Sequence, residues 1–141
     1  MSGFLLDTNC ISELVRLKPE PRVLEWLDAT DEHLLHLSVL TIGEIRKGLV
    51  SLPHGKRRTH LETWLEVDLQ TRFSSRILAI DAPVADRWGV LAAQARHRGR
   101  PLPIVDGLLA ATALHHNLIV VSRNAVDFTN VQVAVLNPWE A

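Results

Sequence analysis

Cysteine is almost absent from this 141-residue chain, and its scarcity excludes two kinds of structure. The one cysteine, Cys10, can form neither an internal disulfide nor a cysteine-based zinc site. A single thiol without a partner motif is more typical of a small buried residue than of a nucleophile, so we expect Cys10 to be buried. This cysteine usage agrees with a reducing compartment, and we predict a cytoplasmic protein.

Long apolar runs are also missing. No stretch approaches the roughly 18 residues that span a bilayer, and residues 1–9 lack the basic start and long apolar centre of a secretion signal. We therefore expect no membrane partner. Internal repeats, linkers and low-complexity segments are absent too, and a composition of 47% hydrophobic and 22% charged residues is typical of a globular protein. The length predicts one domain over residues 1–141.

An excess of basic charge, which often marks nucleic-acid-binding proteins, is the third absence, because the formal net charge is -1. Basic residues nevertheless gather in two places, at residues 46–58 and at residues 96–100. Such clusters are usually solvated helix faces, and they become informative only where they border an active site.

Short apolar strands alternate with helical patterns along the chain. Strands are predicted at residues 4–6, 34–38, 76–81, 118–122 and 131–138, with helices between them. One of these helices is long and amphipathic, and it carries Leu61, Trp64, Leu65 and Leu69 on one stripe. Because the strands are apolar throughout, we predict an α/β fold whose mainly parallel sheet is covered by helices on both faces.

Four carboxylates lie where predicted strands end or helices begin. Asp7 directly follows the first strand, Glu44 lies one turn into the helix after the second, and Asp127 comes five residues after Ser122, which ends "LIVVS". Loops at the carboxyl ends of parallel strands line one crevice, so we expect these three side chains at one edge of the sheet. Asp106 opens the helix that leads into "LIVVS", and the pattern determines its position less firmly.

Each carboxylate also has a purely structural interpretation. Asp7 and Asp106 are good N-cap types, each worth about 1 kcal/mol as a cap. Glu44 fits a solvated helical glutamate, and Asp127 fits a residue that closes a turn. If Asp7 instead belongs to a site, capping can pass to Thr8 or Asn9, which are also N-cap types.

The combination of four carboxylates favours chemistry. Like charges about 4 Å apart repel by roughly 4 kcal/mol at an effective dielectric constant near 20, so a convergent set must take up protons or bind cations. Oxygen ligands alone favour hard ions such as Mg²⁺ or Mn²⁺. Bound beside a phosphate ester, such ions orient a water molecule, lower its pKa and neutralise developing charge.

Two further features have open interpretations. Gly48 lies one helical turn after Glu44, where it indicates either close backbone packing, room beside the glutamate, or a loosened helix end before Pro53. The four tryptophans fit core or dimer contacts better than base stacking; they are Trp26, Trp64, Trp88 and Trp139.

Four motifs, "LLDTN", "EIRKG", "VDGLLAATAL" and "SRNAVDF", resemble the PIN-domain ribonucleases in their order and separation. More narrowly they resemble the VapC toxins of the FitB-like subgroup, and the final "VAVLNPW" is similar to that subgroup's ending. The resemblance spans essentially the whole chain. Two small departures are Ser122, where the family often has Thr, and Gly107, where many PIN domains have Ala.

The resemblance implies a three-layer α/β/α sandwich and places Asp7, Glu44, Asp106 and Asp127 in a catalytic site that binds Mg²⁺ or Mn²⁺. It makes Asn9, Ser122 and Asn124 supporting polar residues. It also implies a homodimer and a cognate antitoxin of the VapB or FitA type, with a higher toxin–antitoxin assembly as a further expectation.

The sequence thus predicts a metal-dependent endoribonuclease toxin that hydrolyses RNA phosphodiester bonds with an activated water. If the basic clusters flank the acidic crevice, RNA phosphates would contact Arg46, Lys47, Arg96, Arg98 and Arg100. The alternative is a catalytically silent module that binds an antitoxin or nucleic acid. A DNA nuclease or a phosphatase that uses the same metals is a second enzymatic alternative.

Overall fold

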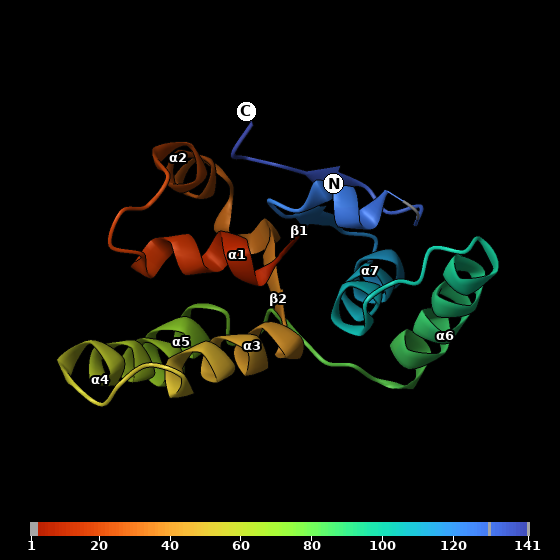
Figure 1. Cartoon of the computed structure of the whole chain (residues 1–141). Helices are drawn as coiled ribbons and strands as arrows, with labels where there is room; N and C mark the ends of the chain where they lie inside the picture. Colours follow the sequence, from red (N-terminus) through yellow and green to blue (C-terminus); the bar gives the residue numbers. More distant parts are fainter. Residues whose placement is uncertain (1–2, 130, 141) are drawn as a thin grey trace.

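The computed structural model describes residues 3–129 and 131–140 (Figure 1). Its centre is a sheet of five parallel strands in the order β3-β2-β1-β4-β5. The strands are β1 (Phe4–Leu6), β2 (Leu35–Ser38), β3 (Ile77–Leu78), β4 (Ile119–Val121) and β5 (Val135–Leu136).

Helices connect these strands. Between β1 and β3 the chain forms α1 (Thr8–Ile11), η1 (Ser12–Val15), α2 (Pro21–Ala29), η2 (Glu32–Leu34), α3 (Val39–Val50), α4 (Lys56–Thr63), η3 (Trp64–Leu69) and α5 (Gln70–Arg72). Beyond β3 it forms α6 (Ala82–His97), α7 (Ile104–His116) and η4 (Ala125–Phe128). Across residues 3–129 and 131–140, every helix is too short or too polar to span a bilayer.

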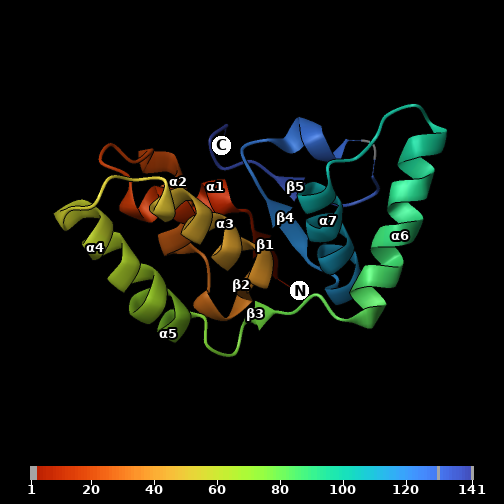
Figure 2. The ribbon, with the colours of Figure 1, turned by 60° about the horizontal axis from the view of Figure 1, so that its bottom comes forward.

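The two faces of the sheet belong to different apolar cores, because successive strand side chains point in opposite directions. Phe4 and Leu6 of β1 pack with apolar residues of α1 to α4 and η3, whereas Leu5 packs with α7 and η4. Figure 2 shows α1 to α5 on one side of the strands and α6 and α7 on the other. The predicted α/β/α sandwich is therefore confirmed.

Strand order reverses beside β1. The chain moves outward from β1 to β2 and β3, and then returns to the opposite side of β1 with β4 and β5. Leu6 pairs with Val121, so the ends of β1 and β4 lie side by side at the switch point, where open α/β sheets bind ligands.

The predicted long helix is present, with one irregularity. Residues 56–72 are continuously helical, and the middle segment, η3, is a π-helix. Leu61, Leu65 and Leu69 of the predicted stripe are buried. The outer strands β3 and β5 are shorter than their apolar patterns predict, since only two residues of each pair with a neighbouring strand.

Candidate active site

Asp7 begins the site at the end of β1, and it is both a helix cap and a buried carboxylate. Its Oδ1 accepts a hydrogen bond from the backbone N–H of Thr8 at 2.7 Å, which makes it the N-cap of α1. Its Oδ2 accepts the hydroxyl of Ser122 at 2.8 Å. The expectation that capping would pass to Thr8 or Asn9 is therefore wrong, because the two oxygens of one carboxylate serve both purposes.

Thr8 links Asp7 to Glu44. While its N–H binds Asp7, its Oγ1 donates to Oε1 of Glu44 at 2.5 Å. Glu44 is held within reach because β2 runs directly into α3, where Ser38 caps the helix by accepting the N–H of Leu40. Sequence reasoning missed Thr8 as a site residue. Its position next to Asp7 at a helix start was the available signal, but its partner is 36 residues away.

Asp106 lies in the first turn of α7 and is not the N-cap, a position that Pro103 occupies without a side-chain bond. A helix that leads into a parallel strand begins at the carboxyl edge of the sheet, which brings Asp106 to the edge where Asp7 lies. Burial raises the pKa of Asp106 to about 6, with further contributions from the charges of Asp127, Asp7 and Glu44.

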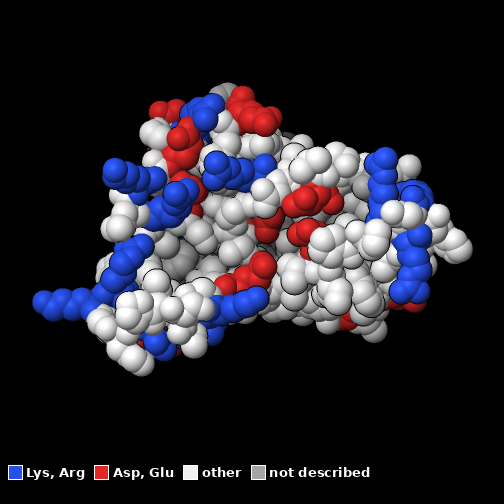
Figure 3. Space-filling view, in the orientation of Figure 1, with Lys and Arg blue, Asp and Glu red and all other residues white. Residues whose placement is uncertain are grey.

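The four carboxylates share one electrostatic environment. Burial raises the pKa of Asp7 as well; the hydrogen bonds from Ser122 and Thr8 oppose that shift, and the charges of Glu44 and Asp127 add to it. Figure 3 shows acidic side chains gathered in the middle of one face, where the elements carrying the four carboxylates meet. The structure thus brings Asp7, Glu44, Asp106 and Asp127 close enough to interact electrostatically.

The expected supporting residues lie around Asp7. Ser122 is fully buried, accepts the backbone N–H of Asn124 at 3.0 Å and lies 3.4 Å from Nδ2 of Asn9. Asn9 also accepts the N–H of Arg123 at 3.3 Å. Asn124 therefore contributes its backbone rather than its side chain to these contacts. A network of hydrogen bonds joins the loop after β4 to the start of α1.

The carboxyl-terminal "NPW" segment fixes the same loop from the other side. Nδ2 of Asn137 donates to the carbonyl of Arg123 at 3.2 Å, and the side chain of Asn137 accepts the N–H of Trp139 at 2.9 Å. The guanidinium carbon of Arg123 lies 5.9 Å from the centre of the Trp139 ring. These contacts give the family-like ending of the chain a structural role beside the site.

A groove of about 590 Å³ opens next to Glu44. It is lined mainly by α3, through Gly43, Glu44, Lys47 and Gly48 among others, and by Val105 of α7. A Cβ atom on Gly48 would meet no atom within 4 Å, so close backbone packing does not explain this glycine. Of the interpretations offered above, room beside the glutamate agrees with its place in the groove wall.

The donor set fits a hard divalent cation. Every charged group in it is an oxygen ligand. Burial is the main cause of the raised pKa values of Asp7 and Asp106, and the neighbouring carboxylates add negative charge that a cation would neutralise. In residues 3–129 and 131–140, no group of three or more His, Cys, Asp or Glu side chains is arranged so that it could hold a metal ion by itself. Mg²⁺ does not require one, since it usually keeps several waters and takes one or two carboxylates directly.

The expected RNA-contacting residues are spread over different surfaces. Arg46 pairs with Glu66 at 2.7 Å and with Glu62 at 3.6 Å, whereas Lys47 lines the groove beside Glu44. The group Arg96, Arg98 and Arg100 lies at the end of α6 and just beyond it. That helix forms the outer edge of the molecule, beyond α7 (Figure 1). Arg123 is exposed next to Ser122, and sequence reasoning missed it.

Cys10 is fully buried in α1, and burial raises the pKa of its thiol to about 12. A thiol in this state is a poor nucleophile, so the prediction of a buried structural cysteine is confirmed.

Comparison with known proteins agrees with the motifs. The family model of the PIN domain matches residues 4–133. VapC ribonuclease Y4jK of Sinorhizobium fredii is 38% identical over 136 residues, 96% of this chain and 97% of that protein. Toxin FitB of Neisseria gonorrhoeae is 40% identical over 135 residues, again 96% and 97%. The crystal structure of FitAcB from Neisseria gonorrhoeae matches with a TM-score of 0.93 at 39% identity, covering 98% of this chain and 99% of that one. The chain therefore belongs to the PIN-domain family.

Proposed function

We propose that this chain is a Mg²⁺- or Mn²⁺-dependent endoribonuclease and the toxin of a toxin–antitoxin pair. The observation that carries the proposal is the shared electrostatic environment of Asp7, Glu44, Asp106 and Asp127 at the switch point of the sheet. The similarity to a VapC ribonuclease and to toxin FitB supports RNA as the substrate and a toxin as the biological role.

Asp7 and Asp106 would hold the metal ion, with Glu44 and Asp127 close enough to take part through water. When bound, the ion supplies a water of lowered pKa and neutralises charge on the phosphate under attack. With a pKa of about 6, Asp106 is largely ionised near pH 7 and can act as a ligand there. Ser122 and Thr8 fix the orientations of Asp7 and Glu44 through the hydrogen bonds described above.

RNA phosphates would be held by Lys47, which lines the groove beside Glu44, and by Arg123, whose backbone N–H binds Asn9. Neither side chain forms an ion pair within residues 3–129 and 131–140, so both charges face solvent beside the site. Of the other basic residues predicted from sequence, Arg46 has its charge satisfied by Glu62 and Glu66.

The same relationship supports the proposed partners. Toxin FitB is similar over nearly the full chain, and a related structure is of FitAB bound to a DNA fragment. We therefore propose a cognate antitoxin of the FitA or VapB type, a homodimeric toxin and action in the cytoplasm. Sedimentation of the chain alone and with a co-expressed antitoxin measures both assemblies.

The decisive experiment compares the wild type with Asp7→Asn on matched RNA and DNA substrates in Mg²⁺ and in Mn²⁺. Asn caps helices as well as Asp does, so α1 should form normally in the variant. We expect metal-dependent cleavage of RNA by the wild type and none by the variant. Asp86→Asn, an exposed change on α6, serves as the matched control and should cleave like the wild type.

Circular dichroism and thermal melting show that each variant is folded. Unchanged RNA cleavage by folded Asp7→Asn would remove the assignment of the site. Preferential cleavage of DNA would replace the ribonuclease by the DNA nuclease alternative. A wild type that cleaves neither substrate and binds no Mn²⁺ in calorimetry would favour the catalytically silent module.

A further inference from the structure

Gly107, the residue after Asp106, lies in a slot too narrow for any side chain. A Cβ atom built on Gly107 would lie 2.9 Å from Cδ1 and 3.0 Å from Nε1 of Trp88, and 3.1 Å from Cδ2 of Leu102. Real Cβ atoms essentially never approach other atoms so closely, so an alanine here requires a neighbour to move. The need for glycine at this position thus has a local physical cause, which is the indole of Trp88.

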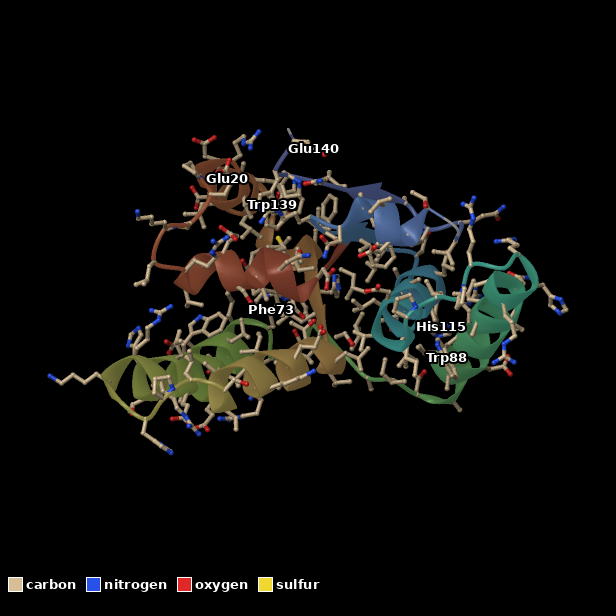
Figure 4. The ribbon with its side chains drawn as sticks, viewed as in Figure 1. Glu20, Phe73, Trp88, His115, Trp139 and Glu140 are labelled. Carbon is tan, nitrogen blue, oxygen red and sulfur yellow. The ribbon has the colours of Figure 1, made fainter. Side chains whose placement is uncertain are left out.

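The ring of Trp88 cannot easily move to make room for a side chain at position 107. The indole is a rigid ring on α6, and its Nε1 is buried without a hydrogen-bond partner in residues 3–129 and 131–140. Leaving such a donor unpaired costs free energy, which indicates that packing against α7 determines where the ring lies. Figure 4 shows Trp88 on α6 next to α7. The ring and the bare backbone of Gly107 therefore define how closely the two helices approach.

The first turn of α7 is held by packing rather than by a side-chain cap, since Leu102 and Val105 pack against the apolar core that contains Leu109. The N-cap of α7 is Pro103, which makes no side-chain capping bond. The connection from α6 is short: Gly99 adopts a left-handed φ of +71°, and the N–H of Arg100 binds the carbonyl of Ala95 at 3.0 Å. The chain thus turns from α6 into α7 within a few residues. Any change in the distance between these helices therefore shifts the position of Asp106.

We propose that Trp88 is a positioning residue, which through its contact with Gly107 holds Asp106 at the depth required for metal binding. The inference rests on the proposed function, because it takes Asp106 as a metal ligand. It assigns a positioning role to a contact between two helices, in which the ring of Trp88 on α6 lies against the bare backbone of Gly107 on α7.

The test measures Mn²⁺ affinity by calorimetry in Gly107→Ala, Trp88→Leu and the double variant, with thermal melting in EDTA as a separate readout. Gly107→Ala should bind Mn²⁺ about tenfold more weakly, as is typical when groups that orient metal ligands are disturbed. The double variant has room for the new methyl group, and its affinity should return to within about threefold of the wild type.

Two controls separate positioning from general stability. Gly89→Ala adds the same methyl group beside Trp88 in sequence, where nothing lies within 4 Å, and should not change Mn²⁺ affinity. Val84→Ala removes part of a fully buried side chain of α6 and should lower the melting temperature without changing Mn²⁺ affinity.

The outcomes are decisive in both directions. A folded Gly107→Ala with wild-type affinity, or a double variant that binds no better than Gly107→Ala, overturns the proposal. If Gly107→Ala does not fold, Trp88→Leu decides alone, and unchanged affinity in that variant overturns it. A wild type that binds no Mn²⁺ refutes the proposed function instead, and is thereby distinguished from failure of this inference.

Discussion

Asp7 both caps a helix and belongs to the carboxylate site, two roles that its sequence context presents as alternatives. A carboxylate has two oxygens and about four lone-pair directions, so two hydrogen bonds do not exhaust its acceptor capacity. Oδ1 binds the N–H of Thr8 and Oδ2 binds the hydroxyl of Ser122, which orients the group without neutralising it. Capping therefore helps to position the carboxylate.

Thr8 provides the first prediction at this scale. Replacing Thr8 with Val preserves the shape of the side chain but removes the hydroxyl that binds Glu44. A hydrogen bond to a charged group contributes about 1.5–3 kcal/mol where it is well buried, and this one is only half-buried. We expect RNA cleavage to fall about tenfold, which corresponds to about 1.4 kcal/mol.

The measurement is the single-turnover cleavage rate at saturating Mn²⁺, with Thr8→Ser as the matched control because it keeps the hydroxyl. Thr8→Ser should cleave within about twofold of the wild type, a difference well below 1 kcal/mol. Equal rates for Thr8→Val and Thr8→Ser would show that the bond to Glu44 has no part in the reaction.

Residue-level prediction from sequence succeeded where a role depends on local context. Asp7 and Ser122 directly follow neighbouring strands, and that position alone indicates their place at the sheet edge. It did not reveal the contacts of Thr8 with Glu44 or of Gly107 with Trp88. Both are side-chain contacts between different elements, and they depend on how closely those elements pack.

At the scale of elements, α3 shows why two adjacent basic residues differ. Successive residues on a helix point about 100° apart, so Arg46 and Lys47 cannot share a face. Arg46 points to the helix formed by residues 56–72 and pairs with Glu62 and Glu66, while Lys47 lines the groove beside Glu44. From the sequence, Arg46 and Lys47 belong to one basic cluster, because adjacent charges do not reveal which side chains each of them contacts in the fold.

We accordingly predict different effects for these neighbours. Lys47→Gln should weaken RNA binding and reduce the slope of log K against log salt concentration by about 0.7, the contribution of one phosphate contact on a single strand. Arg46→Gln should leave that slope unchanged and lower the free energy of unfolding by roughly 0.2–1 kcal/mol, as for an exposed ion pair.

Fluorescence titrations with a labelled RNA at several salt concentrations measure the slopes, using Asp7→Asn protein to prevent cleavage. Equal slopes for Lys47→Gln and the unchanged parent would remove Lys47 from the RNA-binding surface. A reduced slope for Arg46→Gln would show that its ion pairs with Glu62 and Glu66 open when RNA binds.

At the scale of the whole molecule, the fold holds together carboxylates that repel one another. Asp7 and Asp106 have pKa values above their ordinary range, with that of Asp106 at about 6. Between pH 4 and 6 the folded protein therefore binds more protons at Asp106 than the unfolded chain does. The contribution of Asp106 to the free energy of unfolding falls as pH rises through this window and levels off above it.

The metal-free protein should show this contribution when compared with Asp106→Asn, which cannot ionise at that position. In EDTA, the melting temperature of the variant minus that of the wild type should increase from pH 4.5 to pH 7. At pH 7, Mn²⁺ at about 100 times its Kd should stabilise the wild type by about 2.7 kcal/mol, or roughly 8 °C, and Asp106→Asn far less. Calorimetric melting of both proteins tests this coupling. A pH-independent difference between them would show that folding does not raise the pKa of Asp106, and an equal response to Mn²⁺ would place the metal elsewhere.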